Sequence, residues 1–193
     1  MKCVFATPCS QLYELRASED IQLLLPQCVQ EIKDQLEIKP TIFVWGAERH
    51  QARDVGFFSN ESNGYFYSNK LMKSKPLTPS LEMLLQKTND IFKSTFNGIL
   101  VNYYENGNNY ISAHSDDEWD LDPIGVVAIA IGAERMFRIR YKHNKQKAID
   151  YVMKQGYYVH MAGDFQQDCT HEIPKQTKIV LPRYSFTFRR HKT

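Results

Sequence analysis

GILVNYYENGNNYISAH, residues 98–114, decides the fold class of this chain, because it holds two β-rich runs around a turn-forming stretch. The flanking runs are rich in Val, Ile and Tyr, and the turn ENGNN separates them. Further short runs of the same kind follow at residues 124–131, 136–141, 156–161, 177–181 and 184–189. Short strands clustered in one half of a chain predict a β-sandwich or jelly roll and not an alternating βαβ fold.

Helices are expected before this β-rich half. Apolar residues at helical spacing predict one helix over 26–36, with Pro26 at its first position. A second helix is expected over 78–92, where Thr78 can cap and Pro79 can occupy the first turn. Residues 41–77 are aromatic but weakly periodic, as in a hairpin or long loop region. The fold class is therefore α+β, mainly β, with N-terminal supporting helices.

Composition narrows the class of protein. The chain has 193 residues, of which 42% are apolar, and a formal net charge of +2. We expect one domain over 1–193, with helices and a covering region in 1–95 and a jelly-roll core in 96–193. No stretch is apolar for the length of a membrane helix, and four scattered cysteines favour reduced thiols. We therefore expect a soluble, intracellular monomer with no membrane partner.

One histidine and one aspartate at the end of the opening stretch are candidate metal ligands. His114 and Asp116 stand two apart, so on a strand both side chains point to one face. Such a pair arises often by chance, and a solvated acidic loop is the alternative interpretation. His171 follows 55 residues later, where another strand can bring it back. Two imidazoles and one carboxylate form the facial triad of non-heme Fe(II) oxygenases, which leaves coordination positions open.

The last β-rich run offers cations for an acidic cosubstrate. In RYSFTFR, alternation places Arg183, Ser185, Thr187 and Arg189 on one face. A buried arginine needs an anion, and a carboxylate matches its planar fork. Salt bridges to Asp or Glu of the same protein are the alternative.

Four segments together resemble a known family. They are NYYENGNNYISAHSDDE, IGAERMFRIR, MAGDFQQDCTHEIP and PRYSFTFR, and in this order they are similar to the AlkB-type Fe(II)- and 2-oxoglutarate-dependent dioxygenases. The similarity runs from about residue 45 to residue 190. It implies a double-stranded β-helix (jelly roll) and the cofactors Fe(II), 2-oxoglutarate and O2.

The resemblance also assigns residues. It implies that the iron ligands are His114, Asp116 and His171. It implies that 2-oxoglutarate is bound by Asn102, Tyr104, Arg183, Ser185, Thr187 and Arg189. Ser185 departs from the family, where asparagine is usual, so this hydrogen bond is the least secure part of the assignment.

The substrate side follows from the same resemblance. GYFYSN, residues 64–69, is similar to a hairpin that covers the nucleotide, so Tyr65 and Tyr67 are expected to stack on a base and Phe58 to add an aromatic wall. Ordinary cross-strand packing is the alternative for these aromatic residues. Glu118 stands where the family reads an exocyclic amine. The neighbouring acids at 117, 120 and 122 are expected to be solvated or to orient arginine.

Basic residues are candidates for phosphate contact. RIRYKHNKQK, residues 138–147, has five Lys or Arg and no acid, and includes Arg140 and Lys142. Arg49 and Arg53, in the earlier GAERHQARDVG, are expected to extend the same surface. A solvated hairpin tip is the alternative for such a charge run.

These features predict an enzyme that oxidatively demethylates N-alkylated bases in DNA or RNA and releases formaldehyde, succinate and CO2. Two alternatives stay open. A dioxygenase with the same site could hydroxylate a protein side chain or a small molecule. A non-catalytic nucleic-acid-binding relative is disfavoured, because every expected ligand position is filled.

Overall fold

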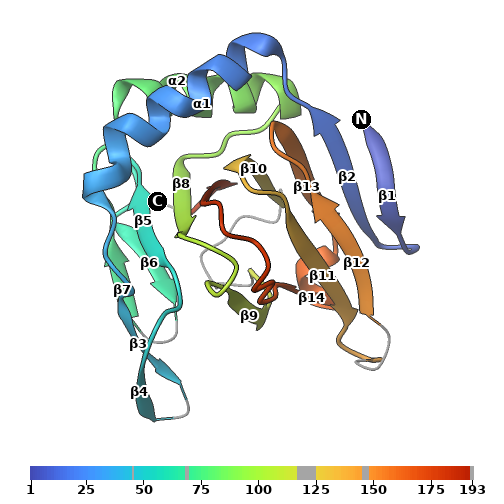
Figure 1. Ribbon diagram of the computed structural model, residues 1–193. Coiled ribbons are helices and arrows are strands. Elements are labelled where there is room, and N and C mark those ends of the chain that lie inside the picture. Colours follow the sequence, from blue (N-terminus) through green and yellow to red (C-terminus); the bar gives the residue numbers. More distant parts are fainter. Residues whose placement is uncertain (45, 68–69, 117–124, 145–147, 192–193) are drawn as a thin grey trace.

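Two antiparallel sheets and a pair of helices make up the structure, which is a computed structural model (Figure 1). It describes residues 1–44, 46–67, 70–116, 125–144 and 148–191, without the side chains of residues 44, 65–67 and 70. The two sheets form the expected jelly roll, and the class is α+β with β structure predominant.

The larger sheet runs through the centre of the molecule. Among the described residues it has seven strands, in the order β1 (Lys2–Ala6), β2 (Ser10–Arg16), β13 (Tyr157–Gly163), β10 (Val126–Gly132), β15 (Arg183–Arg189), β8 (Gly98–Tyr104) and β5 (Asp54–Phe58). Three of these strands precede residue 96. The larger sheet therefore contains strands from both halves of the chain, which was not predicted from the sequence.

The smaller sheet faces the side of the larger sheet that the helices do not cover. Its order is β12 (Ala148–Met153), β11 (Arg135–Tyr141), β14 (Cys169–Ile173) and β9 (Ile111–His114). Two hairpins form separate two-stranded sheets (Figure 1): β3 (Thr41–Val44) with β4 (Ala47–His50), and β6 (Gly64–Tyr67) with β7 (Lys70–Lys73). The second hairpin packs against the larger sheet, where Met72 of β7 contacts residues of β5 and β8. The expected hairpin region over 41–77 is thus two hairpins with β5 between them.

Helices α1 (Glu19–Ile32) and α2 (Pro79–Phe92) lie side by side over the larger sheet (Figure 1). Short helical turns also occur at Lys33–Gln35 (η1) and Phe165–Asp168 (α3). Helix α2 begins as predicted: Thr78 accepts a hydrogen bond from the backbone N–H of Leu81. Such a cap contributes about 1 kcal/mol to stability.

The prediction for the first helix was wrong at its start. Helix α1 begins at Glu19, and Pro26 lies inside it and not at its first position. Two acids in the first turn, Glu19 and Asp20, favour a start there because their negative charges are attracted to the positive end of the helix dipole. The buried stripe of Ile21, Leu25 and Ile32 holds the helix on the sheet despite the proline.

The larger sheet separates two apolar cores. On its helix side, Ile99, Val101, Phe186 and Phe188 pack with the helices. On its other side, a second core fills the space between the sheets and includes Phe137. Alternation along β8 and β15 therefore sends one set of side chains to the helices and the other set toward the smaller sheet.

The predicted strand over 177–181 does not form. Val180 and Leu181 are 78% and 65% exposed, in a loop whose backbone bonds to the turn at Gly107. The Gly107 N–H donates to the carbonyl of Ile179, and a Cβ at Gly107 would lie 1.9 Å from the carbonyl oxygen of Gln176. The β-branched residues here anchor a turn and do not join a sheet.

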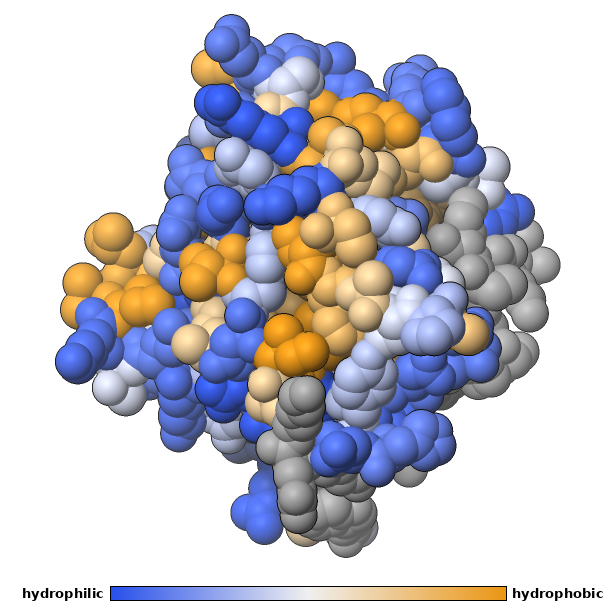
Figure 2. Space-filling model, turned by 90° about the vertical axis from the view of Figure 1, so that its right-hand side faces the viewer, coloured by the Kyte–Doolittle hydropathy of each residue, from blue (hydrophilic) through white to orange (hydrophobic). Residues whose placement is uncertain are grey.

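The N-terminal hairpin closes one side of the space between the sheets. Phe5 of β1 contacts the rings of Tyr141 and Phe165, and Tyr151 of β12 donates a hydrogen bond to Glu14 of β2. Figure 2 shows this side of the molecule, where apolar surface gathers in the middle between polar regions.

Within the described ranges, no helix has the length and apolar character required to span a membrane.

Candidate metal centre and its cavity

His114 and His171 lie opposite each other on neighbouring strands of the smaller sheet. His114 ends β9, His171 lies within β14, and the two are partners in the antiparallel register. Directly opposed residues on one face bring their side chains together, and the ring centroids here are 4.4 Å apart. Strand pairing therefore brings together two histidines that are 57 residues apart in the sequence, as expected.

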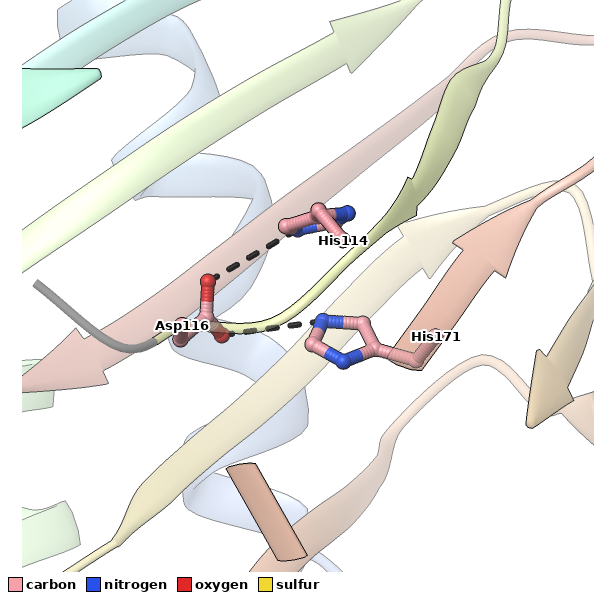
Figure 3. A group of neighbouring side chains, drawn as sticks. All are labelled: His114, Asp116 and His171. Carbon is pink, nitrogen blue, oxygen red and sulfur yellow. Dashed lines mark ion pairs between the residues drawn. The ribbon is translucent and has the colours of Figure 1, made fainter. Parts of the chain in front are cut away.

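Asp116 completes the group from the chain that leaves β9. Its Oδ1 lies 3.7 Å from Nε2 of His114, and its Oδ2 lies 3.6 Å from Nε2 of His171 (Figure 3). One ligand atom from each residue lies within 4.8 Å of the others. The three side chains point toward a common centre, as a facial set of ligands requires.

Burial sets the charge states of this group. Burial, followed by the neighbouring His114, lowers the pKa of His171 to about 3, and burial also lowers the pKa of His114. Burial alone would raise the pKa of Asp116, but Arg189 and the two imidazoles outweigh it and lower that pKa. At neutral pH the site offers two neutral imidazole nitrogens and a carboxylate, which is the donor set that suits Fe(II).

Contacts around the three residues fix their orientation. Asp116 accepts a hydrogen bond from Nη2 of Arg189, and its backbone N–H donates to Oε1 of Gln166 at 2.9 Å. Nδ1 of His114 lies 2.9 Å from the carbonyl oxygen of Ser112, which directs Nε2 toward Asp116. Gln166, on the short helix α3, was not predicted from the sequence because glutamine carries no metal-binding signal.

A cavity extends from these residues along the larger sheet. Its wall includes the predicted face of β15 (Arg183, Ser185, Thr187 and Arg189) and the β8 residues Asn102 and Tyr104. All six side chains are buried. Apolar residues complete the wall: Leu100, Ile111, Ala128, Phe137, Met153, Met161 and Ile173. The structure thus brings together every residue expected to bind the cosubstrate.

Arg183 is a buried cation at the end of this cavity. It is 1% exposed, its Nη2 lies 3.4 Å from Sδ of Met153, and its guanidinium lies 5.7 Å from the Tyr104 ring centroid. Burial lowers its pKa to about 10. Among the residues the structure describes, no carboxylate pairs with Arg183. A buried arginine without an acidic partner fits an anionic ligand in the cavity.

A family model described as the 2OG-Fe(II) oxygenase superfamily matches residues 19–189. The chain belongs to this superfamily. The cofactors that the superfamily's description names, Fe(II) and 2-oxoglutarate, are those predicted from the sequence. The residues present fit both: a group of two histidines and one carboxylate for the metal, and a buried arginine with no acidic partner in the described part of the chain for the acid.

Curated relatives confirm the resemblance of this chain to the AlkB-type dioxygenases. Human "DNA oxidative demethylase ALKBH2" is 27% identical over 155 residues, which cover 76% of this chain and 59% of the relative. Bovine "Alpha-ketoglutarate-dependent dioxygenase alkB homolog 3" is 33% identical over 135 residues, which cover 65% of this chain and 47% of the relative. The chain thus spans about half of the length of these relatives.

A solved structure supports the fold. "The structure of OsALKBH1" aligns with a TM-score of 0.64 and 14% identity, and the alignment covers 98% of this chain and 100% of that one. At this identity the likeness concerns the fold, which is the predicted jelly roll.

The predicted substrate residues have different outcomes. Phe58 was predicted to be an aromatic wall for the base, but it is 0% exposed and lies in the core beneath the helices. Its position on β5 turns it away from the cavity, so the structure makes it a core residue. Tyr65 and Tyr67 lie on β6 of a hairpin, as expected, but their side chains are outside the described part of the chain. Glu118 also lies outside the described residues.

The basic residues that were expected to contact phosphates also differ in where the structure places them. Arg49 is exposed on β4. Arg140 forms an ion pair with Glu172 at 2.5 Å, and Lys142 donates to the backbone carbonyl of Gln166 at 2.8 Å. Arg53, grouped with Arg49 from the sequence, is instead 3% exposed and lines the cavity. The burial of Arg53 could not be predicted from the sequence, because the surrounding segment is mostly polar.

Proposed function

We propose that this chain is an Fe(II)- and 2-oxoglutarate-dependent dioxygenase that oxidatively demethylates N-alkylated bases in DNA or RNA. The observation that carries the proposal is one cavity lined both by the His114–Asp116–His171 group and by buried Arg183, which is at the opposite end of β15 from Arg189, the partner of Asp116. The names of the relatives, a DNA oxidative demethylase and an alpha-ketoglutarate-dependent dioxygenase, support the substrate class and the cosubstrate.

In this proposal His114, Asp116 and His171 hold the metal. When bound, the metal, 2-oxoglutarate and O2 together supply an oxidant that hydroxylates the N-methyl group, with release of succinate and CO2. The hydroxylated group leaves the base nitrogen as formaldehyde. Arg189 keeps Asp116 ionised through its hydrogen bond, so this carboxylate stays available as a ligand.

The cosubstrate is held along β8 and β15. Arg183 binds the carboxylate far from the metal, and Arg189 lies beside the metal end. Asn102, Tyr104, Ser185 and Thr187 offer hydrogen-bonding groups between these two ends. Apolar side chains such as Phe137 and Ile173 keep water from this region, which strengthens each charge interaction within it.

The substrate contacts rest on the hairpins. We propose that Tyr65 and Tyr67 stack on an extruded base and that Glu118 accepts a hydrogen bond from it. Arg49, Arg140 and Lys142 contact phosphates, which would make binding salt-dependent. The ion pair of Arg140 with Glu172 reduces its free charge, so Arg49 is the better supported of the three.

We further propose that residues 1–193 act as one intracellular, monomeric domain. Both halves of the sequence contribute strands to the larger sheet, which supports a single domain. All four cysteines are free thiols, in keeping with a reducing compartment. Size-exclusion chromatography with light scattering tests the monomer, and a stable dimer would refute it.

The function is tested with Fe(II), 2-oxoglutarate, ascorbate and a panel of oligonucleotides with N-methylated bases, as single and double strands of DNA and RNA. Mass spectrometry should detect loss of one methylene unit, together with succinate and formaldehyde. Asp116→Ala is the inactive control. A methylated peptide panel runs in parallel. Succinate formed with peptides and not with any oligonucleotide would favour the protein hydroxylase.

A further inference from the structure

Arg53 makes a buried hydrogen bond to one of the proposed cosubstrate residues. Its Nε donates to Oδ1 of Asn102 at 2.6 Å. Arg53 is 3% exposed and Asn102 is 6% exposed, and both line the cavity that contains His114 and Asp116. A charge-assisted bond between two buried groups is a strong constraint on the softer partner, here the amide.

Strand pairing brings these two residues together. Arg53 directly precedes β5, whose Val55 is the register partner of Asn102 on β8. Since β5 is the edge strand of the larger sheet, the Arg53 side chain reaches the cavity from beyond that edge. The segment between the two hairpins thus supplies a contact to a residue at the centre of the proposed cosubstrate site.

This bond determines which way the Asn102 amide faces. An asparagine side chain ends in an oxygen that accepts and a nitrogen that donates, and the two groups have nearly the same shape. A guanidinium can only donate, so the pairing directs Oδ1 to Arg53. The amide NH2 is then the group that Asn102 presents on its other side, toward the cavity.

2-Oxoglutarate needs a donor at that place. Its two carboxylates and its ketone offer oxygens that accept hydrogen bonds, and it has no donor when ionised. If the Asn102 amide were reversed, its Oδ1 would face an oxygen of 2-oxoglutarate and its NH2 would face the guanidinium of Arg53. The first contact sets two acceptors together and the second sets two donors together, and both are unfavourable. We propose that Arg53 is a positioning residue that holds the Asn102 amide in the orientation able to donate to 2-oxoglutarate. This inference rests on the proposed function.

Two substitutions separate the hydrogen bond from the charge. In glutamine, Nε2 is attached at the same point of the side chain as Nε of arginine, so Arg53→Gln keeps a donor there and removes the charge. Arg53→Met has similar length and places a methyl group at that point. Arg16→Met, at an exposed residue at the end of β2, is the matched control for loss of one arginine.

The measurement is calorimetric titration of 2-oxoglutarate into protein loaded with Mn(II), which gives affinity without turnover. Arg53→Met should weaken 2-oxoglutarate binding about tenfold, as expected for loss of one buried hydrogen bond. Arg53→Gln should stay within about threefold of the unsubstituted protein. The affinity for Mn(II) should not fall in either variant, since each keeps all three metal ligands and removes a positive charge near His114; a general loss of structure would lower it.

A double substitution and a second site complete the test. Arg53→Met combined with Asn102→Ala should bind 2-oxoglutarate no more weakly than Asn102→Ala alone, because Arg53 acts through Asn102. Asn102→Asp keeps an acceptor for Arg53 but replaces the NH2 with oxygen. It should lose at least about tenfold in affinity while it stays folded, and it decides the matter if Arg53→Met does not fold.

Three results would overturn the inference: equal losses in Arg53→Gln and Arg53→Met, additive losses in the double variant, or full affinity in Asn102→Asp. Absence of 2-oxoglutarate binding in the unsubstituted protein would instead refute the proposed function, and the inference with it. The two failures are therefore distinguishable by the first titration.

Discussion

Arg183→Met should weaken 2-oxoglutarate binding and, at the same time, stabilise the ligand-free protein. Burial lowers the pKa of Arg183 to about 10, well below its ordinary value, which corresponds to roughly 3 kcal/mol against the charged form. Without an anion in the cavity this cost acts on the folded state, and methionine removes it. With 2-oxoglutarate bound, the same charge gains its partner, and its loss should cost about 3 kcal/mol, or roughly a hundredfold in affinity.

Thermal unfolding with and without 2-oxoglutarate measures both effects. At a ligand concentration about a hundred times its Kd, binding stabilises the unsubstituted protein by about 2.7 kcal/mol, which the variant should almost entirely lack. In the absence of ligand, Tm should rise in the variant by about 6–12 °C, at about 2–4 °C for each of the roughly 3 kcal/mol. The two melting curves should therefore converge in the variant.

Arg135→Met is the contrasting control. Arg135 is also 1% exposed, but it donates to the backbone carbonyls of Asn106, Asn109 and Pro174 and to the side chain of Gln176. Its removal leaves buried acceptors without donors and should destabilise the protein by at least about 2 kcal/mol. If Arg183→Met destabilised the ligand-free protein as Arg135→Met does and kept its 2-oxoglutarate affinity, the assignment of Arg183 to an anion would be refuted.

Three further outcomes are expected. Asp116→Asn should abolish tight Mn(II) binding in a paramagnetic resonance titration, because a neutral amide replaces the charged ligand; retained binding would contradict the triad. Phe58→Ala should lower the free energy of unfolding by about 3–5 kcal/mol in a urea titration, without raising the KM for an oligonucleotide; a selective KM effect would restore its predicted role. The hydrogen bond from Tyr151 lowers the pKa of Glu14, so its contribution to stability exists above the ordinary pKa of 4.5 and is lost as pH falls through the lower folded value. Tyr151→Phe should therefore unfold more readily than the unsubstituted protein at pH 7, with the difference shrinking in acid; a constant difference would contradict this linkage.

The sequence predicted the parts of the site that depend on alternation. The four residues of the β15 face share a side because strand geometry fixes side-chain direction over a few residues. Asp116 was expected on a strand with His114; it lies just past the end of β9 and still reaches the same centre. Helix α2 was predicted with its cap and its length because Thr78 and Pro79 provide local start signals. Local rules of this kind need no knowledge of the remaining chain.

Features that depend on tertiary pairing were not predicted. Strand β2 was missed, since it gains its β structure from pairing with β13, far along the chain. Strands β1 and β12, each paired with a neighbouring strand, were missed as well. The resemblance placed Phe58 on the substrate side and Arg53 on the basic surface, but the pairing of β5 with β8 sets which of them enters the cavity. The β-rich stretch 177–181 is a loop, whose backbone hydrogen-bonds to the turn at Gly107 and not to a strand.

The double role of β15 affects how this protein could change over generations. Phe186 and Phe188 on one side bind the helices to the sheet, while Ser185 and Thr187 on the other side line the cavity. A substitution that disturbs this strand affects folding and cofactor chemistry together, so the strand has little freedom to vary. The hairpins β3–β4 and β6–β7 pair only within themselves. New substrate preferences could therefore arise in these hairpins while the oxidation chemistry stays intact.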